Sequence, residues 1–78
     1  MLPVIRIATT PVYLYLDAEI NGREVTFRRH RVTGVITRSR GNHRWTYVNA
    51  ETRDAVLATM TAEFLPEKMW LYQETRHA

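Results

Sequence analysis

Arginine is the residue type whose number and spacing could do chemistry in this chain. Seven of the ten arginines lie between Arg23 and Arg44, and Glu24 is the only acid in that stretch. The stretch carries a formal charge of +6, whereas the whole chain of 78 residues carries +3. A local basic patch of this kind favours polyanions, either phosphate backbones or acidic protein surfaces. The sequence therefore predicts a small binding protein.

Aromatic side chains lie among these arginines. Trp45 and Tyr47 alternate, so both fall on one face of an extended strand. Guanidiniums with interleaved aromatics hold phosphates and stack bases in single strands, and the same groups form hot spots against acidic protein surfaces. A solvated charged surface with Trp45 in the core is the structural alternative. The candidate partner-binding residues are Arg28, Arg29, Arg31, Arg38, Arg40, Arg44, Trp45 and Tyr47.

Patterns for catalysis and metal binding are weak. The histidines at positions 30, 43 and 77 lack ligand spacing and there is no cysteine, so neither a metal nor a cofactor is expected. Ser39, the only serine, has no evident base, and the three glycines form no phosphate loop. One enzymatic alternative is a metal-free ribonuclease using His30 or His43 for proton transfer, with arginines stabilising the developing charge. The favoured interpretation is a protein that is not an enzyme.

A β-hairpin positions the first part of the basic stretch. Residues 12–20 alternate apolar and polar side chains, Asn21-Gly22 is the preferred pair for a type I′ turn, and residues 23–27 return antiparallel. This register opposes Tyr15 with Arg28 and Tyr13 with His30 on the outer face. The outer row Tyr13, Tyr15, Asp17 and Glu19 could form a second contact surface. A Tyr15–Arg28 cation–π pair that simply covers the sheet is the favoured interpretation.

The same register would turn Arg29 and Arg31 toward the core. Because unpaired guanidiniums are costly in so small a core, we expect the pairing to bulge, end or splay near Arg28. Gly34 is a plausible place for the chain to bend.

The remaining elements complete an α+β domain. A helix is expected over residues 49–66, capped by Asn49 or Thr52, with Val56, Leu57, Met60 and Phe64 in one apolar stripe and Pro66 as its stop. Strands are expected over residues 4–8, 32–38, 44–48 and 69–73. The expected fold is a four-to-five-stranded antiparallel sheet with one helix packed on it, in the order β-β-β-β-α-β.

Length and composition predict one domain spanning residues 1–78. The longest apolar run, residues 12–16, is far below the roughly 20 residues of a membrane span, so no membrane partner is expected. The lack of cysteine suits a reducing cytoplasm, which would be the host cytoplasm if a phage encodes the chain. If Trp70 and Tyr72 are exposed beside an open sheet edge, a homodimer becomes possible.

Residues 47–66 carry a resemblance to a known family. Ala50, Glu51, Thr52 and Asp54, followed by Phe64-Leu65-Pro66, are similar in type and spacing to the T7-type phage inhibitors of host RNA polymerase. Those inhibitors carry functional arginines on their last strand, whereas residues 70–75 here contain none. The resemblance therefore implies only a phage accessory protein that blocks a host machine, a class to which small anti-CRISPR proteins also belong.

These observations lead to two functional hypotheses. The first is a non-enzymatic phage or mobile-element protein that inhibits a host machine, such as RNA polymerase or a CRISPR complex, by binding an acidic surface. The alternative is a small regulatory protein that binds single-stranded DNA or RNA through the same residues.

Overall fold

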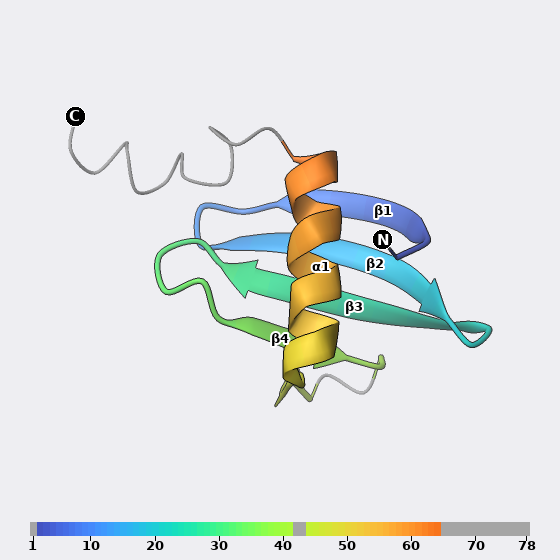
Figure 1. The fold of residues 1–78 in the computed structure, drawn as a ribbon. Coiled ribbons are helices and arrows are strands. Elements are labelled where there is room, and N and C mark those ends of the chain that lie inside the picture. The colour runs from blue at the N-terminus through green and yellow to red at the C-terminus, as the bar shows by residue number, and fades with distance from the viewer. Residues whose placement is uncertain (1, 42–43, 65–78) are drawn as a thin grey trace.

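A five-stranded antiparallel sheet with one helix across it forms the fold, in a computed structural model that describes residues 2–41 and 44–64 (Figure 1). The strands lie side by side in chain order, and the helix α1 follows the last of them. The expected α+β class is confirmed; five strands precede the helix, which agrees with the strand ranges expected there but is one more than in the expected order β-β-β-β-α-β. The strand expected over residues 69–73, which includes Trp70 and Tyr72, lies outside the described residues. The elements are β1 (Val4–Thr9), β2 (Tyr13–Ile20), β3 (Arg23–His30), β4 (Ile36–Ser39), β5 (Thr46–Tyr47) and α1 (Ala50–Glu63).

The hairpin of β2 and β3 forms as the sequence predicts. Asn21 and Gly22 both have positive φ angles, 52° and 76°, which is what a type I′ turn needs. The turn pairs Ile20 with Arg23 and sets the register along the whole hairpin. Side chains of β2 therefore alternate between the face under α1 and the opposite face.

The pairing of β2 with β3 does not stop near Arg28, so the expected interruption there is wrong. Leu14 lies opposite Arg29, and the Arg31 N–H still donates a hydrogen bond of 2.9 Å to the Val12 carbonyl. Both arginines are consequently buried, at 6% exposure for Arg29 and 5% for Arg31. Burial lowers the pKa of the Arg29 guanidinium, because desolvation disfavours its charged form.

The turn after β3 makes room for the Arg29 side chain. Gly34 has a φ of 77° and bends the chain, as expected, and its N–H donates 2.8 Å to the His30 carbonyl. A Cβ atom at Gly34 would lie 3.3 Å from Nη2 of Arg29, so the lack of a side chain leaves space for the guanidinium. Because of this turn, β4 begins at Ile36 and not at Val32.

Replacing Gly34 by alanine is expected to lower the free energy of unfolding by about 1–2 kcal/mol, since the position is left-handed and the new methyl group presses on Arg29. Gly22→Ala is the matched control, because Gly22 has nearly the same φ and a methyl group there would meet nothing within 4 Å. Urea denaturation of both variants should give the larger loss for Gly34→Ala. An equal loss would contradict the contact with Arg29.

The core lies between α1 and one face of the sheet. Asn49 caps the helix as expected, its Oδ1 accepting 2.7 Å from the Thr52 N–H. Val56, Met60 and Phe64 are buried, but Leu57 is 40% exposed. The buried core residues are Leu14, Leu16, Ala18, Val25, Phe27, Ile36, Val56, Met60 and Phe64.

Thr59 takes the buried position that the sequence pattern assigned to Leu57. Its hydroxyl donates 2.8 Å to the Ala55 carbonyl and accepts 3.0 Å from the Leu2 N–H, so its polar atom is satisfied and ties the helix to the chain just before β1. Among the described residues, the 14-residue α1 is the longest helical stretch, and it lacks the length and apolar character of a membrane span.

Candidate functional site

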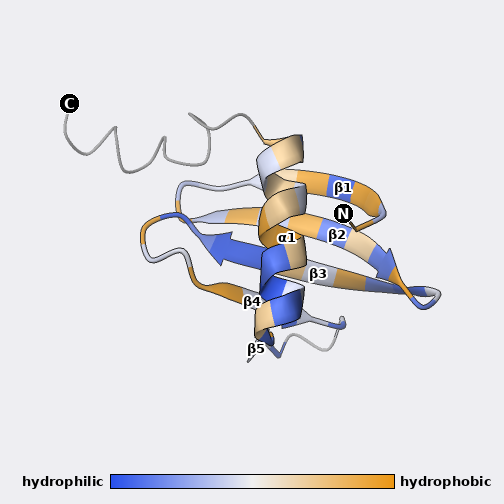
Figure 2. Cartoon of the chain, viewed as in Figure 1, coloured by the Kyte–Doolittle hydropathy of each residue, from blue (hydrophilic) through white to orange (hydrophobic). Residues whose placement is uncertain are grey.

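The sheet face opposite α1, here called the open face, is not covered by any helix or strand of residues 2–41 and 44–64 (Figure 1). It divides into two zones with different chemistry. Around Asp17 lie ion pairs, and toward the other end of β2 lie aromatic rings. The end of β3 beside these rings is strongly hydrophilic (Figure 2).

In the first zone, one arginine is shared by two carboxylates. Nη1 of Arg6 lies 3.0 Å from Oδ2 of Asp17 and 2.7 Å from Oε1 of Glu24. The Thr26 hydroxyl donates 2.6 Å to the second Asp17 oxygen. Arg6 is thus committed to this internal network, and the three groups together carry a net negative charge, so the zone offers no cation to a polyanion.

Aromatic rings make up the second zone, which we call the aromatic cluster. The ring centroids of Tyr13 and Tyr15 lie 5.9 Å apart, Tyr13 meets His30 at 5.2 Å edge to face, and Tyr15 meets Trp45 at 6.3 Å. Such tilted and edge-on arrangements are favourable for aromatic pairs. The cluster brings together residues from β2, β3 and the chain just before β5.

Arg28 lies in the middle of the aromatic cluster. Its guanidinium carbon is 4.3 Å from the centroid of Tyr13 and 4.0 Å from that of Trp45, which is cation–π distance for both. Its Nε also donates weakly, at 3.4 Å, to the Thr37 hydroxyl. The expected pair with Tyr15 is not the one that forms. Tyr15 lies opposite Arg28 in the register, but the long side chain reaches the diagonal ring of Tyr13 instead.

His30 has a fixed orientation at the edge of the aromatic cluster. Its Nδ1 accepts hydrogen bonds from the N–H groups of Val32 at 3.1 Å and Thr33 at 3.2 Å. In the neutral ring the proton is therefore on Nε2, which is left as a donor. A ribonuclease mechanism through His30 would have to use Nε2, and His43 lies outside the described residues.

A hollow of about 230 Å³ opens beside these rings on the open face. It is lined on one side by Tyr13, Arg28 and His30, and on the other by Thr37 and Tyr47. Tyr47 is 80% exposed, so one face of its ring is available to a ligand. A flat group entering this hollow would meet aromatic surface together with a guanidinium.

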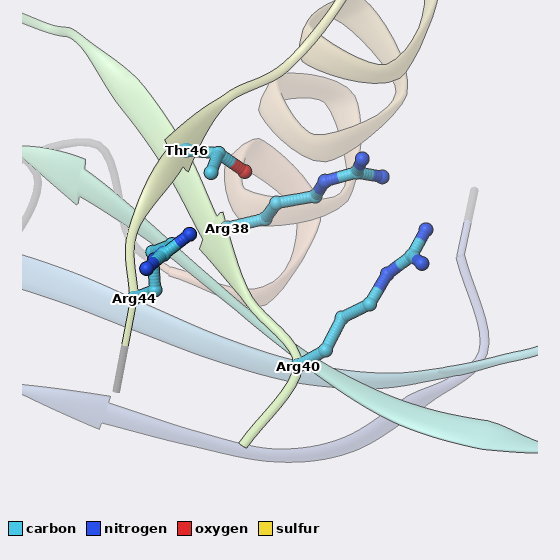
Figure 3. A pocket seen from close by; sticks show the side chains of 4 residues that line it. All are labelled: Arg38, Arg40, Arg44 and Thr46. Carbon is cyan, nitrogen blue, oxygen red and sulfur yellow. The ribbon is translucent and has the colours of Figure 1, made fainter. Parts of the chain in front are cut away.

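Three further arginines surround a second, smaller hollow, which we call the arginine pocket. Its volume is about 140 Å³, and Arg38, Arg40, Arg44 and Thr46 line it. Arg38 and Arg40 extend from the end of β4, and Arg44 and Thr46 come from the neighbouring segment that leads into β5 (Figure 3). Arg38 pairs with Phe27 and Thr46, so it points to the side of the sheet that carries α1.

Residues 44–47 join the two sites. Along this extended segment, Arg44 and Thr46 line the arginine pocket. Trp45 belongs to the aromatic cluster, and Tyr47 lines the hollow beside that cluster. The edge segment of the sheet therefore presents guanidiniums on one side and aromatic rings on the other.

The structure thus separates the eight sequence-predicted site residues into three groups. Arg28, Trp45 and Tyr47 lie on the open face, and Arg38, Arg40 and Arg44 surround the arginine pocket. Arg29 and Arg31 are buried, which corrects the expectation that they belong to an exposed basic surface; the uninterrupted pairing of β3 turns them inward.

The eight predicted partner-binding residues did not include several residues that complete the site. Tyr13, Tyr15 and His30 belong to the aromatic cluster, and the alternation along β2 already placed both tyrosines on the outer face. Thr37 and Thr46 line the two hollows and carried no sequence signal beyond their strand positions.

Comparisons with protein-family models, with curated proteins and with solved structures found no match to this chain. The resemblance of residues 47–66 to polymerase inhibitors therefore stays a prediction. Within the described part of the chain, no three His, Asp or Glu side chains gather as a metal-binding group would.

Proposed function

We propose that the protein binds single-stranded DNA or RNA across the edge of the sheet formed by residues 44–47. The single observation that supports this proposal most is the alternation of side chains along residues 44–47. Arg44 and Thr46 line the arginine pocket, and Trp45 lies in the aromatic cluster. Proteins bind single strands by combining these two elements, because phosphates need positive charge and unstacked bases need aromatic surfaces. Bases would stack on Trp45 and Tyr47, and the phosphates would contact the arginines.

The charge distribution supports this division of roles. Arg6 is already paired with Asp17 and Glu24, so the ion-pair zone has no excess positive charge to offer. The arginines that line the two hollows are Arg28 in the aromatic cluster and the three of the arginine pocket. As proposed, the protein is a cytoplasmic binding module that acts without catalysis and without a cofactor.

The salt dependence of binding tests this function. With about four arginines on phosphates, log affinity should fall against log salt with a slope near −2.8, a loss of about fiftyfold between roughly 50 and 200 mM salt. Fluorescence anisotropy with a labelled oligonucleotide of about twelve nucleotides measures this. Arg40→Gln should reduce the slope by about 0.7, whereas Arg6→Gln, which removes a guanidinium already paired with Asp17 and Glu24, should leave it nearly unchanged. No measurable binding at the lowest salt would overturn the proposal.

The second candidate is inhibition of a host machine by a phage or mobile-element protein that occupies an acidic protein surface. It is favoured by the exposure of Tyr47 on the edge strand β5, where arginine, tryptophan and tyrosine form the usual anchors of a protein interface. Tagged wild-type protein would then retain one host complex after nuclease treatment, and the Trp45→Ala variant would not. Retention only with intact nucleic acid would favour the first candidate.

A further inference from the structure

The hollow beside the aromatic cluster is lined by hydrogen-bond donors. Among the described residues that line it, none carries a carboxylate or an amide side chain. The two Nη groups of Arg28 make no hydrogen bond within residues 2–41 and 44–64, and its Nε donates only weakly to the Thr37 hydroxyl. A guanidinium can donate hydrogen bonds but cannot accept them. The hollow therefore suits a ligand that presents acceptors.

His30 adds a second donor to the same hollow. Because its Nδ1 accepts from the N–H groups of Val32 and Thr33, the neutral ring carries its proton on Nε2. Within the described part of the chain, this Nε2 has no acceptor. The Thr37 hydroxyl accepts from Arg28, so its own hydrogen can be donated as well. An amino group entering the hollow would meet donors and leave its own hydrogens unpaired, which is costly.

Two aromatic rings restrain the Arg28 side chain. Tyr13 on β2 lies 4.3 Å from its guanidinium carbon, and Trp45, just before β5, lies 4.0 Å from it. These contacts limit the conformations of a long side chain that would otherwise have many. Arg28 therefore loses less conformational entropy when its planar fork forms hydrogen bonds to a ligand.

The four bases differ in what they offer to such a fork. The edge of guanine that carries O6 and N7 presents two acceptors and no donor, whereas adenine and cytosine present an amino group. Uracil and thymine present one carbonyl oxygen there. A guanidinium binds O6 and N7 together, through two parallel hydrogen bonds. Guanine is thus the base that matches the donors of the hollow.

The size of the hollow and the position of Tyr47 agree with a base that enters by this edge. A protein cavity of about 150 Å³ holds a benzene molecule. The volume of about 230 Å³ beside the aromatic cluster therefore admits most of a purine, with the sugar left outside. Tyr47, which lines the hollow and is 80% exposed, offers its ring to the face of the base.

We propose that this hollow binds guanine, with the Arg28 fork donating to O6 and N7 and Tyr47 stacking on the base. The proposal rests on the function inferred above and deepens it, because it names the base that the single strand presents. In a strand without guanine, Arg28 is left to contact a phosphate.

Competition among strands that differ in one base tests this proposal. Strands of about eight nucleotides, abasic except at one central position, carry guanine, hypoxanthine, 7-deazaguanine or adenine there and compete with a labelled probe. The guanine strand should bind at least about fivefold more tightly than the adenine strand, the low end of what a bidentate arginine contact supplies. Hypoxanthine keeps O6 and N7 and should match guanine. 7-Deazaguanine lacks N7 and should lose most of the gain.

Two variants show whether Arg28 is the origin of the preference. Arg28→Lys keeps the charge but removes the fork, so the ratio of guanine to 7-deazaguanine affinity should fall close to one. Arg6→Lys makes the same exchange on the same face, at a residue paired with Asp17 and Glu24, and should keep the ratio. Circular dichroism confirms that both variants are folded.

A mixed-sequence strand with all its bases separates the two ways of failing. If it binds while the four single-base strands compete equally or not at all, the guanine proposal is wrong and strand binding stands. A guanine preference that survives Arg28→Lys also overturns the proposal. If the mixed-sequence strand does not bind, the proposed function fails and this proposal fails with it.

Discussion

Replacing Trp45 and Tyr47 together by alanine is expected to weaken binding of a single-stranded oligonucleotide by at least about thirtyfold. Stacking of a base on an aromatic side chain contributes about 1–3 kcal/mol, so two rings contribute at least about 2 kcal/mol. Tyr47 is the more exposed of the two, and Trp45 packs on Arg28. Removing the Trp45 ring therefore also takes away one of the two rings that contact the Arg28 guanidinium. Fluorescence anisotropy at fixed salt measures the loss.

The control for this variant is Leu57→Ala. Leu57 is also a large exposed hydrophobic residue, but it lies on α1, across the sheet from the open face. It should leave oligonucleotide affinity within about twofold of wild type, a difference of less than about 0.5 kcal/mol. If the variant with both Trp45→Ala and Tyr47→Ala remains folded and binds as tightly as the wild type, stacking on these two rings does not contribute to binding.

Phe27→Ala is expected to cause the largest loss of stability. Phe27 is 1% exposed at the centre of the sheet, between Leu16 on β2 and Arg38 on β4. Truncating such a residue costs about 3–5 kcal/mol, because transfer energy is lost and a cavity remains. Domains of this size have roughly 4–12 kcal/mol of stability in total. The variant should therefore lose at least about a quarter of that stability, and a chain at the lower end of the range would be unfolded.

Urea denaturation followed by circular dichroism measures this effect. The Leu57→Ala variant again serves as the control, since truncating a partly exposed side chain should change the free energy of unfolding by less than about 1 kcal/mol. A Phe27→Ala protein with a wild-type denaturation midpoint would mean that the core of β2, β3 and α1 is assembled differently.

Local patterns were sufficient to predict the hairpin and the helix. The Asn21-Gly22 turn sets the β2–β3 register, and Asn49 caps α1, because both signals depend on a few neighbouring residues. The burial of Arg29, in contrast, depends on a tertiary contact. Its burial requires the space beside Gly34, and a sequence pattern does not reveal that the two meet. An energetic rule against buried arginine led to the wrong expectation.

The site was predicted in composition but not in arrangement. Trp45 and Tyr47 share a face, as alternation requires, and the basic stretch does supply the arginines of both hollows. The sequence suggested one continuous basic surface, however, and the fold divides it. Arg28 joins the aromatic cluster, Arg38 points to the other side of the sheet, and Arg29 and Arg31 enter the interior. Strand pairing across β3, β4 and β5 decides each of these positions.

In the proposed function, a single strand lies over residues 44–47, with bases on the aromatic cluster and a phosphate in the arginine pocket. Nuclear magnetic resonance of the labelled protein during oligonucleotide titration tests it most directly. We expect shifts for the Trp45 indole N–H, the Arg28 and Arg40 Nε–H groups and the Tyr47 amide, with little change at Leu57. Shifts confined to α1 or to the Arg6 ion pairs, with Trp45 unmoved, would contradict it.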